Sequence, residues 1–114
     1  MPYSIKDHFA NKDASVKAIY DAILRTAESW GPVTEEAKKT SIHLIRKTAF
    51  AGVATRKSSL ILTIKSETDL KSRRIAKRQQ ASRSRWYLEL KLESPEALDP
   101  ELTGWLKSSY ELSE

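Results

Sequence analysis

The sequence contains no cysteine, only two histidines and only three glycines among its 114 residues. Without cysteine there can be no disulfide bond and no thiol nucleophile. His8 and His43 stand alone in the sequence, without the spacing of metal-ligating side chains, which excludes a structural zinc site. Three scattered glycines cannot form the glycine-rich loop that cradles a phosphate. No cofactor is therefore predicted.

Long apolar runs are also missing. The longest ones, TAFAGVA and SLILTI, are far shorter than the roughly 18 residues that a membrane-spanning helix needs. Met1 is not followed by the charged and then apolar segments of a secretory signal. The sequence therefore predicts a cytoplasmic protein with no membrane partner, and the length predicts one domain over residues 1–114.

Positive charge is concentrated in the middle of the chain. Residues 37–85 contain fourteen Lys or Arg against two acidic residues, whereas the two flanks together contain six basic and thirteen acidic residues. The net charge of the whole chain is +5. Such blocks are usually solvated faces, and less often a surface that attracts an anionic partner. Both interpretations stay open.

Helical periodicity marks both ends of the chain. Ser4 followed by Asp7 resembles a capping box and predicts a short N-terminal helix. Asp13 precedes apolar residues at the 3.6-residue period, which predicts a long helix ending at Gly31 and Pro32. In the C-terminal flank, the segments SPE and DPE each combine a capping residue, a proline and an acid, and predict a last helix.

Between these helices the apolar period falls from 3.6 to two, which is typical of strands. In the last of them Trp86 shares a face with three leucines, whereas Tyr87 points to the wetter face. The short connections favour antiparallel neighbours. We predict an α+β fold in which an antiparallel sheet of four to five strands is covered on one face by an N-terminal and a C-terminal helix. The predicted strands are Val33–Lys38, Ser41–Arg46, Ala49–Thr55, Leu60–Lys65 and Arg85–Glu93.

Several short motifs stand out along the chain: Lys39-Thr40-Ser41-Ile42, Ala49-Phe50-Ala51, Arg74-Ile75, Gln80 with Ser82, Arg85-Trp86 and the stretch from Leu106 to Leu112. In these motifs the chain resembles a small bacterial family catalogued as domain-of-unknown-function family 5655. The resemblance covers nearly the whole chain and implies a small single-domain α+β protein, but it implies no activity. The family has His after its Arg-aromatic pair, where this chain has Tyr87, so no proton-transfer role is carried over to that position.

A basic segment precedes the last predicted strand. Residues 66–84 are predicted to be a long connection, and such loops are usually functional or disordered. Their basic side chains could contact phosphates while neighbouring Gln and Ser donate hydrogen bonds, or the segment could be a solvated loop. Tyr87 is better placed than Trp86 to contact a ligand. The candidate anion-binding residues are Lys71, Arg73, Arg74, Lys77, Arg78, Arg83, Arg85 and Tyr87.

Two patterns bear on catalysis. Glu89-Leu90-Lys91 has the carboxylate and lysine spacing of metal-dependent nucleases, with Asp69 as an upstream acid, but a cross-strand ion pair is the more ordinary interpretation. His43 is better interpreted as a histidine of the sheet surface or the core than as a base. Catalytic activity stays open, and a non-catalytic role is favoured.

Two functions from different classes follow. The first is a non-catalytic binding domain that holds an anionic macromolecule, either nucleic acid or an acidic protein, on its basic sheet and loop. The second is a structural or assembly domain whose open sheet face pairs with a second copy to form a homodimer. Salt dependence of binding separates the two, because only the first releases counterions from an anionic partner.

Overall fold

The computed structural model describes residues 3–114. In that part of the chain, no helix combines the length and the apolar character needed to cross a membrane. The elements are η1 (Lys6–Phe9), α1 (Ala14–Glu28), β1 (Thr34–Ala37), β2 (Ile42–Ile45), β3 (Ala49–Thr55), β4 (Leu60–Ser66), β5 (Ile75–Ser82), β6 (Arg85–Leu92), η2 (Pro95–Ala97) and α2 (Pro100–Glu111).

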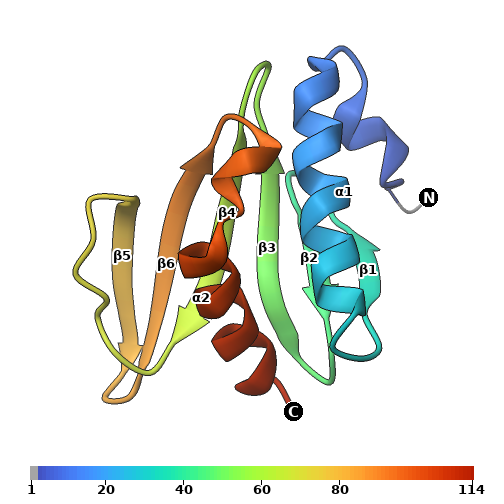
Figure 1. Cartoon of the computed structure of the whole chain (residues 1–114). Coiled ribbons are helices and arrows are strands. Elements are labelled where there is room, and N and C mark those ends of the chain that lie inside the picture. Colours follow the sequence, from blue (N-terminus) through green and yellow to red (C-terminus); the bar gives the residue numbers. More distant parts are fainter. Residues whose placement is uncertain (1–2) are drawn as a thin grey trace.

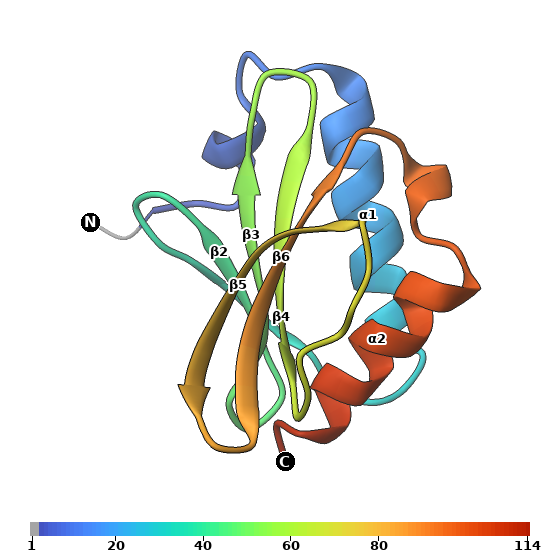
Figure 2. The same ribbon diagram turned by 90° about the vertical axis from the view of Figure 1, so that its left-hand side faces the viewer.

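The strands form one antiparallel sheet in the order β1-β2-β3-β4-β6-β5 (Figure 1). Helices α1 and α2 lie side by side on the same face of that sheet (Figure 2). The predicted two-layer α+β fold is therefore confirmed, with six strands instead of four or five.

The additional strand is β5, within the segment that we expected to be a long connection. It pairs only with β6, from Ile75 opposite Leu90 to Ser82 opposite Arg85, and all of its residues except Ile75 are exposed. A strand at the edge of a sheet that buries almost nothing needs no alternation of apolar residues. Its charged side chains also discourage pairing with another sheet. The prediction of a loop was therefore wrong for residues 75–82.

The core lies between the two helices and the sheet. Trp86 packs against it half-buried, whereas Tyr87 is 41% exposed on the other face, as the alternation in β6 predicts. The buried side chains come from one stripe of each helix and from alternate positions of the central strands, including Val16, Ile19, Ile23, Leu44, Val53, Leu62, Ile64, Leu88, Leu90, Leu102 and Leu106.

The helix signals in the sequence are largely confirmed. The predicted short N-terminal helix is the 3₁₀ helix η1. Asp99 is the N-cap of α2, and its carboxylate accepts from the Leu102 backbone N–H at 3.0 Å. Asp13 stands at the N-cap of α1, but its carboxylate accepts from Ser58 Oγ at 2.7 Å instead of from the helix backbone.

The turn after α1 packs against the other helix. Gly31 has a φ of 156°, and a Cβ at this position would lie 2.5 Å from the Tyr110 hydroxyl oxygen. That hydroxyl donates to the backbone oxygen of Pro32 at 3.0 Å. Glycine is therefore required here by both the backbone conformation and the close approach of α2.

Candidate functional site

The face of the sheet turned away from α1 and α2 is called the open face below. Residues paired across antiparallel strands point to the same face, so the register of the strands identifies its members. One row crosses all six strands and consists of Glu36, His43, Gly52, Thr63, Glu89 and Lys77.

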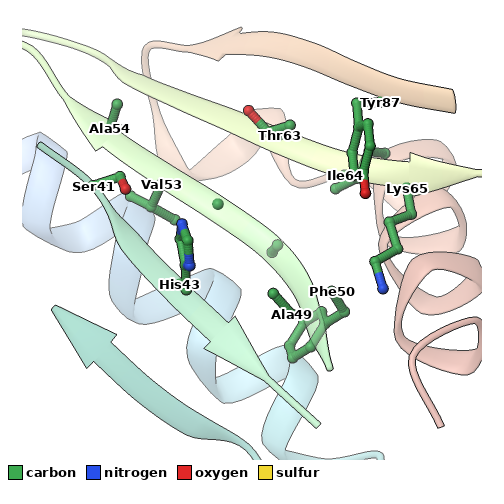
Figure 3. A pocket seen from close by; sticks show the side chains of 12 residues that line it. Ser41, His43, Ala49, Phe50, Val53, Ala54, Thr63, Ile64, Lys65 and Tyr87 are labelled. Carbon is green, nitrogen blue, oxygen red and sulfur yellow. The ribbon is translucent and has the colours of Figure 1, made fainter. Parts of the chain in front are cut away.

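A hollow of about 360 Å³ lies at the centre of the open face (Figure 3), and we call it the central groove. Gly52 and Ala54 on β3 lie between the strands that carry its walls and present little side chain to fill it. His43 on β2 stands on one side, and Thr63 on β4 and Tyr87 on β6 stand on the other. The volume lies within the range of small-molecule sites.

Glycine at position 52 is not required by the fold. Its φ is not positive, and a Cβ built on it would make an ordinary contact of 3.7 Å with the Thr63 Cβ. A glycine inside a strand costs about 0.5 to 1 kcal/mol relative to alanine. What the missing side chain provides is open space over the backbone of β3, as at sites where a ligand approaches a strand closely.

The polar side chains of the central groove are free to bind. Among the side-chain hydrogen bonds of residues 3–114, none involves His43, Thr63 or Tyr87. The imidazole and both hydroxyl groups can therefore donate or accept hydrogen bonds with a ligand.

Lys65 lies at the end of the central groove that is nearest the C-terminus of α2. Its Nζ donates to Thr48 Oγ1 at 3.1 Å and to Ser113 Oγ at 2.9 Å. Within residues 3–114 it makes no salt bridge. Burial and then the positive charge of Arg85 lower the pKa of the Lys65 amine below its usual value. The ammonium is thus positioned by two hydroxyls but is not neutralised by an acid.

Ser109 on α2 fixes the backbone beside Lys65. The β3–β4 pairing begins only at Ala51 and Ile64, and the β2–β3 register passes over Phe50. The buried Ser109 hydroxyl accepts from the Lys65 backbone N–H at 2.8 Å and donates to the Phe50 oxygen at 2.5 Å. It therefore bridges two backbone groups that the sheet leaves apart.

Arg74, one of the predicted anion-binding residues, belongs to an intramolecular cluster. Its Nη1 lies 2.8 Å from Asp99 Oδ1 and 3.1 Å from Glu101 Oε1, and its Nη2 donates to the Ala97 oxygen at 2.6 Å. The Arg74 guanidinium also lies 5.9 Å from the centroid of the Trp105 ring. These contacts tie the start of β5 to η2 and α2.

Asp69 holds two more of the predicted residues. It contacts Arg78 Nε at 2.6 Å and Lys71 Nζ at 2.7 Å. The hydrogen bond from Lys71, and then the positive charge of Arg78, hold the pKa of the Asp69 carboxyl below its usual value. Asp69 is therefore engaged with cations, and residues 3–114 include no group of three or more His, Asp or Glu that could hold a metal. Glu89 lies opposite Thr63 and Lys77 on the open face.

The other predicted basic residues have no ion-pair partner within residues 3–114: Arg73, Lys77, Arg83 and Arg85. Lys77 and Tyr87 line a second hollow of about 270 Å³ beside the central groove. The structure thus brings Lys77, Arg85 and Tyr87 together on the open face with Lys65. Our sequence reasoning did not propose Lys65, Thr63 or Gly52 for a site, although a glycine inside a predicted strand was a signal of close backbone approach.

Comparison with known proteins identifies the family but adds no activity. No curated protein and no solved structure matches the chain. Residues 5–113 match the family described as Domain of unknown function (DUF5655). Because the match spans nearly the whole sequence, the chain belongs to the DUF5655 family.

Proposed function

We propose that this domain is a non-catalytic binding module that holds an anionic polymer, a single-stranded nucleic acid, on its open face. The observation that carries the proposal is a group of cations around the exposed Tyr87 that have no ion-pair partner in the described part of the chain, residues 3–114. Lys65 lies directly opposite Tyr87, Lys77 lines a hollow with it, and Arg85 precedes it by two residues on the same strand face.

The charge distribution between the two layers supports this choice of face. Residues 93–114, which include η2 and α2, contain six acidic residues and one lysine. Lys65, Lys77 and Arg85 lie instead on the opposite side of the sheet, and Arg83 lies at the β5–β6 turn. A field of this polarity draws an anion to the open face and away from α2.

A single strand fits this face better than a duplex. Six strands at a spacing of about 4.8 Å span roughly 24 Å, which is wider than the roughly 12 Å major groove of duplex DNA. The bases of a single strand can stack on an exposed aromatic ring while cations contact the phosphates. Tyr87 supplies that ring at 41% exposure.

Self-association through the open face receives less support from the surface. Within residues 3–114, the exposed large hydrophobic residues are Tyr3 and Tyr87, so the face lacks the apolar centre of a stable homodimer. Two copies placed face to face would also bring like charges together. A nucleic-acid partner agrees with the cytoplasmic location that the sequence predicts, and both stand as proposals.

The test is fluorescence anisotropy with a labelled single strand and a labelled duplex over a range of salt concentrations. We expect log affinity for the single strand to fall linearly with log salt, by about 0.7 for each phosphate contacted. Lys77→Gln should flatten that slope by about 0.7, and Tyr87→Ala should weaken binding by about 1 to 3 kcal/mol. Lys107→Gln on α2 removes the same charge from the helical layer and should change neither.

Three results would contradict the proposal or assign the open face to a different partner. If the wild-type domain binds no single strand more tightly than about 100 µM at low salt, a level reached by non-specific binding, the proposal is wrong. Tight binding of an acidic peptide in its place would assign the face to an acidic protein. A dimer mass in light scattering, abolished by changes on the open face, would assign the face to assembly.

A further inference from the structure

We propose that Lys65 and Arg85 hold the phosphate of a nucleotide at the end of the central groove, with the base lying over Gly52 between His43 and Thr63. The ligand class is a nucleoside monophosphate, either free or as one unit of a strand. The inference names the unit that the open face recognises and so rests on the proposed function, but the two can fail separately.

The phosphate part follows from two neighbouring cations. Lys65 pairs with Tyr87, and Arg85 lies two residues before Tyr87 on the same face. Such diagonal neighbours have Cα atoms about 7 to 8 Å apart, within reach of two long side chains. Neither cation has an acid within salt-bridge distance among residues 3–114. An anion between them would relieve their repulsion, which contributes to the lowered pKa of Lys65.

Lys65 is also positioned in advance. Thr48 Oγ1 and Ser113 Oγ accept two of the three ammonium protons, which leaves one donor for a ligand. A side chain that is already held loses less conformational entropy when it binds.

The base part follows from the floor and walls of the central groove. His43 and Thr63 flank Gly52 on the two neighbouring strands, so their backbones lie two strand spacings, about 9.6 Å, apart. That gap admits a planar ring, and the two side chains offer hydrogen bonds to its edge. Thr63 and Lys65 are two residues apart, about 6.8 Å along β4, a separation comparable with that of the base and the phosphate in one nucleotide.

A purely structural role explains only part of this arrangement. A cation near the C-terminus of a helix is favoured by the helix dipole, which accounts for Lys65 beside α2. It does not account for Arg85 on β6, or for a glycine at position 52 that neither φ nor packing requires.

The experiment is a ¹⁵N–¹H NMR titration with adenosine 5′-monophosphate, adenosine and inorganic phosphate. We expect the monophosphate to shift the amide signals of Gly52, Lys65 and Tyr87, with adenosine binding more weakly. Lys65→Gln and Arg85→Gln should each weaken monophosphate binding about tenfold or more, since each removes a charge-assisted hydrogen bond. Gly52→Val should weaken the monophosphate but not inorganic phosphate, because it fills only the base position.

Lys107→Gln is the matched charge control, and the spectrum of each variant reports whether it remains folded. The inference is overturned if the monophosphate at about 10 mM leaves those amides unshifted, or if adenosine binds as tightly as the monophosphate. It is equally overturned if Gly52→Val leaves monophosphate binding unchanged.

A parallel arm uses an unlabelled single strand of about eight nucleotides. If the strand binds the wild type but Lys65→Gln and Arg85→Gln bind it equally well, the phosphate position is wrong while the proposed function stands. If the monophosphate binds as expected and the strand does not, the inference stands for a free nucleotide and the proposed function fails.

Discussion

The hydroxyl of Ser109 should contribute far more to stability than its size suggests. It is fully buried, accepts from the Lys65 N–H and donates to the Phe50 oxygen. Ser109→Ala removes the hydroxyl that both groups share and leaves a buried donor, the Lys65 N–H, and a buried acceptor, the Phe50 oxygen, without this hydrogen bond. Each such group costs about 1 to 3 kcal/mol. Since both lie at one end of the sheet, where some rearrangement can compensate, we expect a loss of about 2 to 4 kcal/mol in the free energy of unfolding.

Urea denaturation measures this loss. With an m-value of about 2 kcal/mol per molar, in the middle of the usual range, the midpoint should fall by about 1 to 2 M. Ser108→Ala is the matched control, because it removes the same hydroxyl from the exposed neighbouring position on α2. Its effect should stay within about 0.5 kcal/mol. Amide exchange of Lys65 should also become faster in Ser109→Ala.

Equal midpoints for the two serine variants would refute the reasoning. So would a large loss of stability with unchanged protection of the Lys65 amide, because the cost would then arise from packing and not from the bridge.

Three further perturbations test other parts of the fold. Arg74→Gln should lower the free energy of unfolding in urea by about 1 to 2 kcal/mol, because it breaks charge-assisted hydrogen bonds to η2 and α2. The control Arg73→Gln, which breaks no ion pair within residues 3–114, should cost less than about 0.5 kcal/mol, and equal costs would contradict the role of the Arg74 cluster. Gly104→Ala should stabilise the protein by about 0.5 to 1 kcal/mol, because alanine favours the helix and the added methyl meets no atom within 4 Å. Gly31→Ala should destabilise it, because its Cβ would lie 2.5 Å from the Tyr110 hydroxyl oxygen, so the two thermal midpoints should shift in opposite directions. The Leu102 N–H, and then Arg74, lower the pKa of Asp99, so the ionised carboxylate stabilises the fold above its usual pKa of about 4, and this contribution is lost as the pH falls through the folded pKa. The difference in unfolding free energy between wild type and Asp99→Asn should therefore shrink below about pH 4. A difference that stays constant down to about pH 2 would contradict this role of Asp99.

The elements that bury one side could be predicted from the sequence. Strand β3 coincides with the predicted Ala49–Thr55, and the other four predicted strands end within two residues of the observed bounds. In β2, β3, β4 and β6 the alternation reflects which side chains face the core, whereas β1 has no buried residue. Strand β5 shows no alternation of apolar and polar residues, because seven of its eight residues are exposed and it is held by backbone pairing with β6. Apolar periodicity therefore gave no signal for β5.

The candidate site could be predicted only in part. The sequence presents the basic residues of 71–85 as equivalent, but their roles depend on acids that the fold brings to them. Arg74 meets Asp99 from 25 positions away, and only the docking of η2 and α2 against the start of β5 creates that contact. The free cations of the open face become distinguishable only once these pairs are known. Lys65 became a candidate because the register places it opposite Tyr87.

The cations that stabilise the fold are different from the cations proposed to bind a ligand, and two arginines at the ends of α2 belong to the first group. Arg74 binds the N-cap residue Asp99, while Arg46 donates to the Tyr110 oxygen at 3.2 Å and lies 4.4 Å from the centroid of its ring, near the C-terminal end. Both fasten the helical layer to the sheet. Within residues 3–114, Lys77 and Arg85 have no comparable contact, so the fold depends little on their charge, and the proposed anion binding would use it. The change in net charge alone therefore does not predict how a variant behaves. Neutralising Arg74 and neutralising Lys77 lower the net charge equally, but the first should reduce the stability of the fold and the second should weaken only the proposed binding of a ligand.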